Sequence, residues 1–396
     1  MNKRALTVIF LVVFIDLVGF GIVIPLLPLY GEQYHPGPAQ FGTLMMIYSL
    51  MQFLFSPILG RLSDRYGRRP VLLISLTGNV AGYLTFAFQQ SLEALFLARI
   101  VAGICGGNIS TAHAVIADTT GPQDRAKGMG LVGAAFGLGF IFGPAIGGIA
   151  LEISESAPGL FAAGLSAAAF VFALIALPET WSAEKRLGGA SRRYGTFSLE
   201  GLLRAVSHPQ IGVLLLIFFL TTFAFANFEG TFALYLEHRM GLGPKQVAYL
   251  FAYVGILGAV IQGGLIGRVV KAFGERRLVV TGLALLACGF AGLILIDTTP
   301  PMLALLGVLA LGTGLANPSL SSLVSKHATI DEQGGVFGIY QSVASFARIL
   351  GPFWGVYSFQ RFGTNFPYVT AGAVSLACCA LALVSFRGLR DRTRLQ

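Results

Sequence analysis

Few of the chain's 396 residues are charged: Asp, Glu, Lys and Arg make up 11% of the sequence, and hydrophobic residues make up 55%. A soluble domain carries about 25% charged residues, so this composition excludes an ordinary water-soluble protein. Repeated apolar runs of about 20 residues, each long enough to cross a bilayer as a helix, explain the deficit. A β-barrel would need short alternating segments, and the stretch "ALTVIFLVVFIDLVGFGIVIPLL" does not alternate.

Twelve apolar segments follow one another along the chain, and we expect each to form a membrane-spanning helix. A long polar stretch separates the sixth segment from the seventh, and Ser198 before apolar residues at helical spacing predicts a short interfacial helix there. We therefore expect a six-helix bundle over 1–180, a cytoplasmic linker over 181–209 and a second six-helix bundle over 210–396. The apolar segments are 5–28, 40–60, 71–90, 92–118, 128–150, 159–178, 210–236, 246–266, 278–297, 301–323, 335–358 and 366–386.

The distribution of positive charge predicts the orientation of these segments. With the N-terminus placed in the cytoplasm, 22 of the 27 Lys and Arg residues fall in inner segments, 3 in outer loops and 2 within spans. Inner loops of membrane proteins carry such an excess of basic residues, so we expect both termini to be cytoplasmic. The net charge of +9 then faces anionic lipid headgroups, and we expect no nucleic-acid partner.

An internal repeat divides the chain into two similar halves. Three motifs recur in the same order at offsets of 207 to 209 residues. Since six spans are duplicated, both halves enter the membrane in the same sense, which is the parallel-repeat arrangement of transporters. The matching pairs are 60–73 with 267–280, 103–110 with 312–319, and 143–148 with 351–356.

Three motifs in the first half resemble those of the major facilitator superfamily. They are "GRLSDRYGRRP" at 60–70, "RIVAG" at 99–103 and "GLGFIFGPAIGG" at 137–148. The first half is most similar to the tetracycline/proton antiporters and related drug exporters. The resemblance implies an all-α membrane fold of two pseudo-symmetric six-helix bundles. It also implies a monomeric antiporter in a bacterial inner membrane that contributes to multidrug efflux and antibiotic resistance.

Two acids inside the spans are candidates for proton binding. Asp16 lies in the middle of the first span, where an ionised carboxylate costs about 2.5–3.5 kcal/mol and should face a cavity or a partner. Glu229 is the one acid well within the spans of the second half. The alternatives are a helix-packing hydrogen bond for Asp16 and a place in an outer vestibule for Glu229.

Two basic residues of the fourth span are further candidates for proton coupling. Arg99 lies too deep to reach water easily, so we expect it to pair with a carboxylate or with backbone carbonyls. The resemblance implies a role in proton coupling, and a structural tether between spans is the alternative. His113 can titrate near neutral pH, although a lone His in a helix is more often a packing residue.

Four polar residues within the spans are candidates for lining a substrate cavity. Arg348 precedes the second Gly-Pro motif by three residues and is either a counter-charge to a carboxylate or an anionic substrate, or a structural residue. The candidates are Asn108, Asn227, Gln341 and Arg348.

The loop 60–70 concentrates five charges in eleven residues, in an order that topology alone does not require. Gly60 and Gly67 permit a close approach and a turn, and Asp64 can accept from a helix N-terminus. Arg68 or Arg69 can reach Asp118 at the inner end of the fourth span, a pairing that the resemblance also implies. We expect this group to latch the inner side of the protein in one conformation. The predicted gate comprises Gly60, Asp64, Arg65, Gly67, Arg68, Arg69 and Asp118.

The fifth span carries Gly139, Gly143 and Gly147 on one face, with Pro144 between them. Small residues at this spacing let helices approach closely, and proline bends a helix. We expect tight packing here, at an interface between the halves that seals against proton leak.

The function that these features favour is export of small amphipathic molecules in exchange for protons. No phosphate-binding loop and no metal-ligand spacing occur, so we expect no enzyme activity, metal or cofactor, with the proton gradient as the energy source. Gly82 stands where tetracycline exporters carry an acid, which favours another drug, a lipid or a metabolite as the substrate. The alternatives are an importer of the same fold and, more remotely, a membrane receptor or scaffold.

Overall fold

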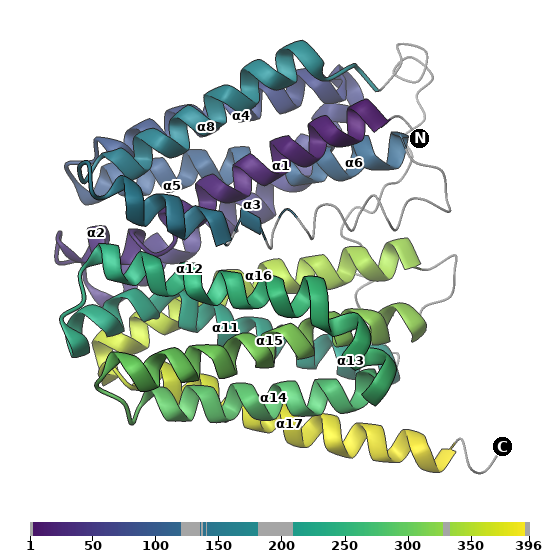
Figure 1. Cartoon of the computed structure of the whole chain (residues 1–396). Coiled ribbons are helices and arrows are strands. Elements are labelled where there is room, and N and C mark those ends of the chain that lie inside the picture. Colours follow the sequence, from purple (N-terminus) through teal and green to yellow (C-terminus); the bar gives the residue numbers. More distant parts are fainter. Residues whose placement is uncertain are drawn as a thin grey trace. The chain divides into compact units, whose positions relative to one another are not determined.

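The structure is a computed structural model that describes residues 3–119, 135, 138–139, 141–180, 209–327 and 333–392. Every regular element in these ranges is helical (Figure 1). The predicted interfacial helix lies outside the described residues. The helices of the first half are α1 (Lys3–Val23), α2 (Leu27–Glu32), α3 (Pro38–Tyr66), α4 (Arg68–Ala87), α5 (Leu92–Gly106), α6 (Ile109–Thr119), the helix Ile141–Ala150 and α8 (Ala157–Ala176).

The helices of the second half follow the same order of long apolar elements. One of them is interrupted by a π-helical turn, which separates α12 from α13. The elements are α11 (Pro209–Met240), α12 (Pro244–Val260), the π-helical turn η1 (Ile261–Leu265), α13 (Ile266–Phe273), α14 (Glu275–Leu293), α15 (Thr299–His327), α16 (Gln333–Phe362) and α17 (Phe366–Arg392).

The predicted spans correspond to helices throughout the described part of the chain. Nine helices in these ranges are long and apolar enough to cross a membrane, and two shorter apolar helices, Ile141–Ala150 and Pro244–Val260, accompany them. The described helices overlap all twelve predicted segments. The fourth and eighth segments are each divided between helices, and of the fifth, 128–150, the structure describes the helix Ile141–Ala150 and a few residues before it. The all-helical membrane fold is therefore confirmed, because the bilayer demands long apolar runs that satisfy their own backbone hydrogen bonds.

The chain divides into two compact units. The first unit comprises Met1–Tyr194 with Leu242–Gly255, and the second unit comprises Gly195–Gly241 with Ile256–Gln396. The stretch Leu242–Gly255 thus groups with the first unit, although it belongs to the second predicted bundle. The predicted domain boundaries stay a prediction.

In the first unit, α1 packs against α8 and α6, while α4 packs between α8 and α5 (Figure 1). Apolar residues from α1, α4, α6 and α8 form a common core, which includes Val12, Leu76, Val115 and Ala169. Ser91 starts α5, since its side-chain oxygen accepts a hydrogen bond from the backbone N–H of Ala94 at 3.2 Å. This packing fixes the relative positions of α1, α4 and α6, which carry polar groups described below.

In the second unit, α11 packs against α16 and α17, and α14 packs against α15 and α17. Its core draws on α11, α14, α15, α16 and α17, with Phe218 stacked on Tyr340 at 3.7 Å between ring centres. The turn before α14 repeats the turn before α4. Gly274 has φ of +76° and Gly67 has φ of +109°, a region that favours glycine. The turn predicted at Gly67 is confirmed, and the repeat extends to backbone conformation.

A polar tether joins three helix ends of the second unit. Arg239, in the last turn of α11, donates from Nε to the carboxylate of Asp297 and from Nη1 to Asn365 Oδ1 at 2.6 Å. Its guanidinium also lies 5.6 Å from the centre of the Tyr235 ring. The hydrogen bond from Arg239 lowers the pKa of Asp297, which lies between α14 and α15 outside the spans.

We expect Asp297→Asn to lower the melting temperature of the detergent-purified protein slightly at pH 7. Because the folded pKa of Asp297 is depressed, its contribution is present above its unfolded pKa, near 3.8, and is lost as the pH falls through the folded value. The difference between the melting temperatures of wild type and variant should therefore narrow as the pH falls from 7 to 3. Arg239→Gln should be more destabilising at both pH values, since it also loses the contacts with Asn365 and Tyr235. A difference in melting temperature that is as large at pH 3 as at pH 7 would contradict a stabilising role of the ionised Asp297.

Candidate functional site

Asp16, in the middle of α1, is bound by amides from two other elements of the first unit. Asn79 of α4 donates from Nδ2 to Oδ1 of Asp16 at 3.1 Å, and Asn108 donates from Nδ2 to Oδ2 at 2.5 Å. Asn79 and Asn108 are buried, and Asp16 itself is partly buried. Among the described residues, no Lys or Arg forms an ion pair with Asp16. We call Asp16, Asn79 and Asn108 the Asp16 cluster.

Asn108 reaches Asp16 because the fourth span is interrupted there. α5 ends at Gly106 and α6 begins at Ile109, and the intervening backbone N–H groups of Gly107 and Asn108 donate three residues back, to Ile104 and Cys105. Gln52 of α3 donates to the carbonyl of Gly106 at 3.0 Å, which satisfies a group that the interruption frees. Interrupted spans of this kind line binding sites in transporters.

Arg99 corrects one sequence-based expectation. No carboxylate among the described residues pairs with it; instead its guanidinium lies 4.4 Å from the ring centre of Tyr48 and 5.9 Å from that of Phe20. Arg99 is buried, and its Nε has no hydrogen-bond partner among the described atoms. The aromatic ring faces stabilise the cation in place of an acid. In this conformation the described residues show no ion pair between Arg99 and Asp16, whose carboxylate is bound by two amides.

His113 is partly buried in α6 and forms no hydrogen bond or ion pair with another described residue in this structure. Its role in proton coupling stays a prediction.

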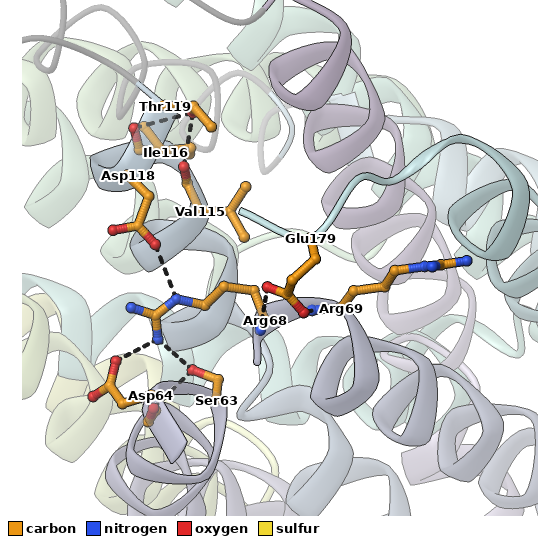
Figure 2. A network of polar contacts seen from close by, with 10 residues as sticks. Ser63, Asp64, Arg68, Arg69, Val115, Ile116, Asp118, Thr119 and Glu179 are labelled. Carbon is orange, nitrogen blue, oxygen red and sulfur yellow. Dashed lines mark hydrogen bonds and ion pairs between the residues drawn. The ribbon is translucent and has the colours of Figure 1, made fainter. Parts of the chain in front are cut away.

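Arg68 is the centre of a polar network at one end of the first unit (Figure 2). Its side chain is almost fully buried, and its Nε donates to Asp118 at 3.1 Å. Its Nη1 lies 2.5 Å from the Asp64 carboxylate and 2.6 Å from the Ser63 hydroxyl. The predicted contact with Asp118 is therefore present and is made by Arg68. The network links α3, α4 and α6.

Glu179, just after α8, adds a fourth segment to this network and was not expected from the sequence. Its two carboxylate oxygens accept from the backbone N–H groups of Arg68 at 3.0 Å and of Arg69 at 3.3 Å (Figure 2). These N–H groups lie in the first turn of α4, where the helix itself supplies no acceptor and a carboxylate is stabilising. Asp64, which we expected to accept from a helix N-terminus, binds the Arg68 side chain. We call Ser63, Asp64, Arg68, Asp118 and Glu179 the Arg68 network.

Other residues of the predicted gate contribute less. Arg65 is exposed, and its guanidinium lies 5.3 Å from the ring centre of its neighbour Tyr66. Arg69 donates to the carbonyl of Leu174 in α8. A Cβ at Gly60 would meet Ser110 at an ordinary 3.6 Å, so close helix approach does not require glycine there. The gating role of these residues stays a prediction.

The second unit carries a related ion pair with its charges exchanged. Glu275 begins α14 as Arg68 begins α4, and it binds Lys326 and Ser322 of α15. The Lys326 side chain is 61% exposed, whereas both Arg68 and Asp118 are buried. Exposed pairs contribute little to stability, so of these two described ion pairs we expect the buried one in the first unit to contribute more.

The fifth-span glycines pack against α1 within the first unit. A Cβ at Gly139 would lie 2.6 Å from Leu17 Cβ, and one at Gly143 would lie 2.6 Å from Gly21 Cα. Gly147 is less crowded, with its nearest atom at 3.4 Å. The expected tight packing is present, and it holds α1, which carries Asp16. A role for these glycines and Pro144 between the two halves stays a prediction.

Glu229 and Arg348 are neighbours in the second unit. Both are partly buried, on α11 and α16, and their charges interact electrostatically. This agrees with the proposal that Arg348 is a counter-charge to a carboxylate. The helices are held together by close contacts of small residues, since a Cβ at Gly351 would lie 2.8 Å from Ala226.

Asn227 and Gln341, two of the predicted cavity residues, differ in their surroundings. Asn227 is fully buried and donates from Nδ2 to the carbonyl of Pro367 at 2.8 Å, which ties α11 to α17. Gln341 is exposed on α16. The position of Asn227 suits helix packing, and a contact of either residue with substrate stays a prediction.

A family model described as the Major Facilitator Superfamily matches residues 9–352 and 263–395. The chain belongs to this superfamily. It is accordingly a multi-pass membrane protein and a secondary transporter of small molecules, not an enzyme. The motifs at 60–70, 99–103 and 137–148 indicate the same family from the sequence alone.

Individual relatives cover nearly the whole chain. Tetracycline resistance protein, class B, from Escherichia coli is 33% identical over 341 residues, which cover 85% of this chain and 84% of that protein. Multidrug resistance protein 2 from Bacillus subtilis (strain 168) is 29% identical over 379 residues, covering 94% and 92%. The crystal structure of the human organic anion transporter MFSD10 (TETRAN) has a TM-score of 0.71 and 28% identity, covering 96% and 99%.

Proposed function

We propose that the protein exports small amphipathic, drug-like molecules from the cytoplasm in exchange for protons. The observation that carries this proposal is the Asp16 cluster: a carboxylate in the middle of a membrane-spanning helix, bound by two uncharged amides and by no cation among the described residues. Such a carboxylate can take up a proton without breaking an ion pair. Buried acids of this kind in membrane helices form proton relays.

In this mechanism the substrate and the proton bind in competition, and each favours a different opening of an alternating-access cycle. Substrate that enters from the cytoplasm promotes release of the proton, and reprotonation from outside returns the empty protein. Glu229 is the second candidate for proton binding. The relatives named for tetracycline and multidrug resistance support a drug-like substrate, and we propose a cytoplasmic membrane location with both termini inside and a monomeric protein.

A proton-coupled transporter of organic anions is the second candidate function. Arg348 beside Glu229 favours it, because protonation of Glu229 would leave the Arg348 charge available to a substrate carboxylate. The human relative that is named as an organic anion transporter agrees with this alternative. Uptake of labelled substrate by inverted and right-side-out vesicles distinguishes export from import.

We expect Asp16→Asn to abolish substrate-induced proton release from the purified protein, because the variant has no group to protonate at this position. The measurement is the pH change of a weakly buffered detergent solution on addition of tetracycline or of other amphipathic drugs. Glu229→Gln should reduce the release, and Asp297→Asn, which removes an acid outside the spans, should leave it intact. Release that persists in Asp16→Asn, or that no compound elicits from wild type, would refute the proposal.

A further inference from the structure

We propose that Asn79 and Asn108 are positioning residues that convert protonation of Asp16 into a rearrangement of the α5–α6 junction. The inference deepens the proposed function, and it rests on it only in taking Asp16 as the group that exchanges the proton. The junction comprises residues 104–110, where the fourth span is interrupted.

The donors and acceptors of the Asp16 cluster favour an ionised carboxylate. Each amide presents an N–H to a different oxygen of Asp16, at 3.1 Å from Asn79 and 2.5 Å from Asn108. An ionised carboxylate accepts both hydrogen bonds, whereas a protonated one carries an O–H donor on one oxygen. That oxygen is then a weaker acceptor, and its O–H competes with the amide N–H for the same space. Protonation therefore weakens one amide bond or favours a turned amide whose carbonyl accepts from Asp16.

The bond from Asn108 is the one that we expect to change. Asn79 lies within the continuous helix α4, whose backbone restrains it. Asn108 lies in the junction, where the hydrogen bonds span three residues rather than four and a side chain, Gln52, satisfies a backbone carbonyl. A segment held in this way rearranges at lower cost than an intact helix. Protonation of Asp16 would thus separate α1 from the junction while α1 stays bound to α4.

Other charges near the cluster are few. Tyr83 of α4 and Cys105 of α5 are the titratable groups of the described elements that interact electrostatically with Asp16. Arg99 interacts with Tyr48 and Tyr83, and Asp118 of α6 is bound by Arg68. His113 is the remaining titratable group of α6, and neither α8 nor the helix Ile141–Ala150 carries one. The hydrogen bonds from Asn79 and Asn108 are therefore the main polar contacts that stabilise the ionised form of Asp16.

The first test is an infrared pH titration of the purified protein. The carboxyl band of Asp16 is identified as the difference between wild type and Asp16→Asn. We expect Asn79→Leu and Asn108→Leu each to raise the pH at which the band half disappears by about one unit or more, because each removes a donor that stabilises the ionised form. The matched control is Asn227→Leu, which deletes a buried interhelical amide of the second unit and should leave the midpoint unchanged.

The second test follows the junction itself by hydrogen–deuterium exchange, corrected for the intrinsic effect of pH on exchange. In wild type, we expect the amides of residues 104–110 to exchange faster below the titration midpoint of Asp16 than above it. In Asn108→Leu their exchange should be fast at every pH. In Asn79→Leu it should keep its pH dependence, with the transition moved to higher pH. If Asn108→Leu does not fold, Asn108→Ala carries the same expectations with a smaller side chain.

The inference is overturned if neither asparagine variant moves the infrared midpoint beyond the Asn227→Leu control, or if junction exchange in wild type does not change across the Asp16 titration. Both measurements are made without substrate. If no drug elicits proton release but both measurements give the expected results, antiport is refuted and this inference stands. If drugs elicit proton release but the infrared midpoint or the junction exchange does not change as expected, this inference alone is refuted.

Discussion

Arg68→Met is expected to lower the melting temperature of the detergent-purified protein much more than Arg65→Met does. The side chain of Arg68 is 2% exposed and that of its partner Asp118 is 4% exposed, so removal of the guanidinium takes from a buried carboxylate its contact with Arg68. Breaking a buried ion pair from one side costs about 3–5 kcal/mol, mainly because the remaining charge stays desolvated. Arg65, three residues earlier, is exposed and bears the same charge.

A double-mutant cycle identifies the source of this effect. Asp118→Asn in the Arg68→Met background should restore part of the lost stability, since it removes the uncompensated charge. Thermal unfolding of wild type, the two single variants and the double variant measures the coupling, which should be strong for groups in direct contact. Melting of Arg68→Met at the temperature of Arg65→Met, or additive effects of the two substitutions, would show that the pair contributes little.

Much of the fold follows from the sequence because a membrane imposes few solutions. A helix that crosses a bilayer needs about 20 apolar residues, so the twelve spans can be predicted from the sequence without knowledge of any contact. The repeat can also be predicted, because its motifs recur at a nearly constant offset. Gly67 and Gly274 occupy matching positions, and both have a positive φ. The contact of Arg68 with Asp118 was predictable as well, because both residues fall at the inner ends of neighbouring spans.

Contacts between spans distant in sequence were harder to predict. Nothing in "TGNVAGYLTF" indicates that Asn79 meets Asp16, because the relative rotation and depth of α1 and α4 arise only from packing. The one available signal was a polar amide inside an apolar span, and Asn108 had been noted on that basis. Glu179 follows the sixth span, at the same predicted cytoplasmic side as the loop 60–70. This shared position is the one sequence feature that could have suggested its contact with Arg68.

Arg99 shows where reasoning from charge alone fails. A buried cation in a membrane is expected to pair with a carboxylate or with backbone carbonyls, yet the guanidinium of Arg99 lies beside the rings of Tyr48 and Phe20. Aromatic residues are so frequent in this chain, with 32 Phe and 12 Tyr, that their presence in a span carried no positional information. Because aromatic residues occur in nearly every span, the sequence did not indicate which of them would contact Arg99.

Gly143→Ala should be poorly tolerated, and Gly147→Ala, four residues later in the same motif, should be accepted. A Cβ at Gly143 would lie 2.6 Å from Gly21 Cα and 2.8 Å from the carbonyl oxygen of Val18, both backbone atoms of α1 that cannot turn aside. The two helices would have to separate, at a cost of about 1–3 kcal/mol. At Gly147 the nearest atom is 3.4 Å away, which is ordinary contact.

The pair of variants separates close packing from the loss of helix flexibility. Both replace glycine with alanine in one helix, so any gain in helix propensity is shared and the difference in melting temperature reports the contact with α1. Gly21→Ala should reproduce the defect of Gly143→Ala from the other side, since its Cβ would lie 2.7 Å from the carbonyl oxygen of Gly139. Equal melting of Gly143→Ala and Gly147→Ala would mean that α1 is not held at this distance. Because α1 carries Asp16, the displaced helix should also weaken the two amide bonds of the Asp16 cluster, and the infrared midpoint of Asp16 should move in Gly143→Ala and stay in place in Gly147→Ala.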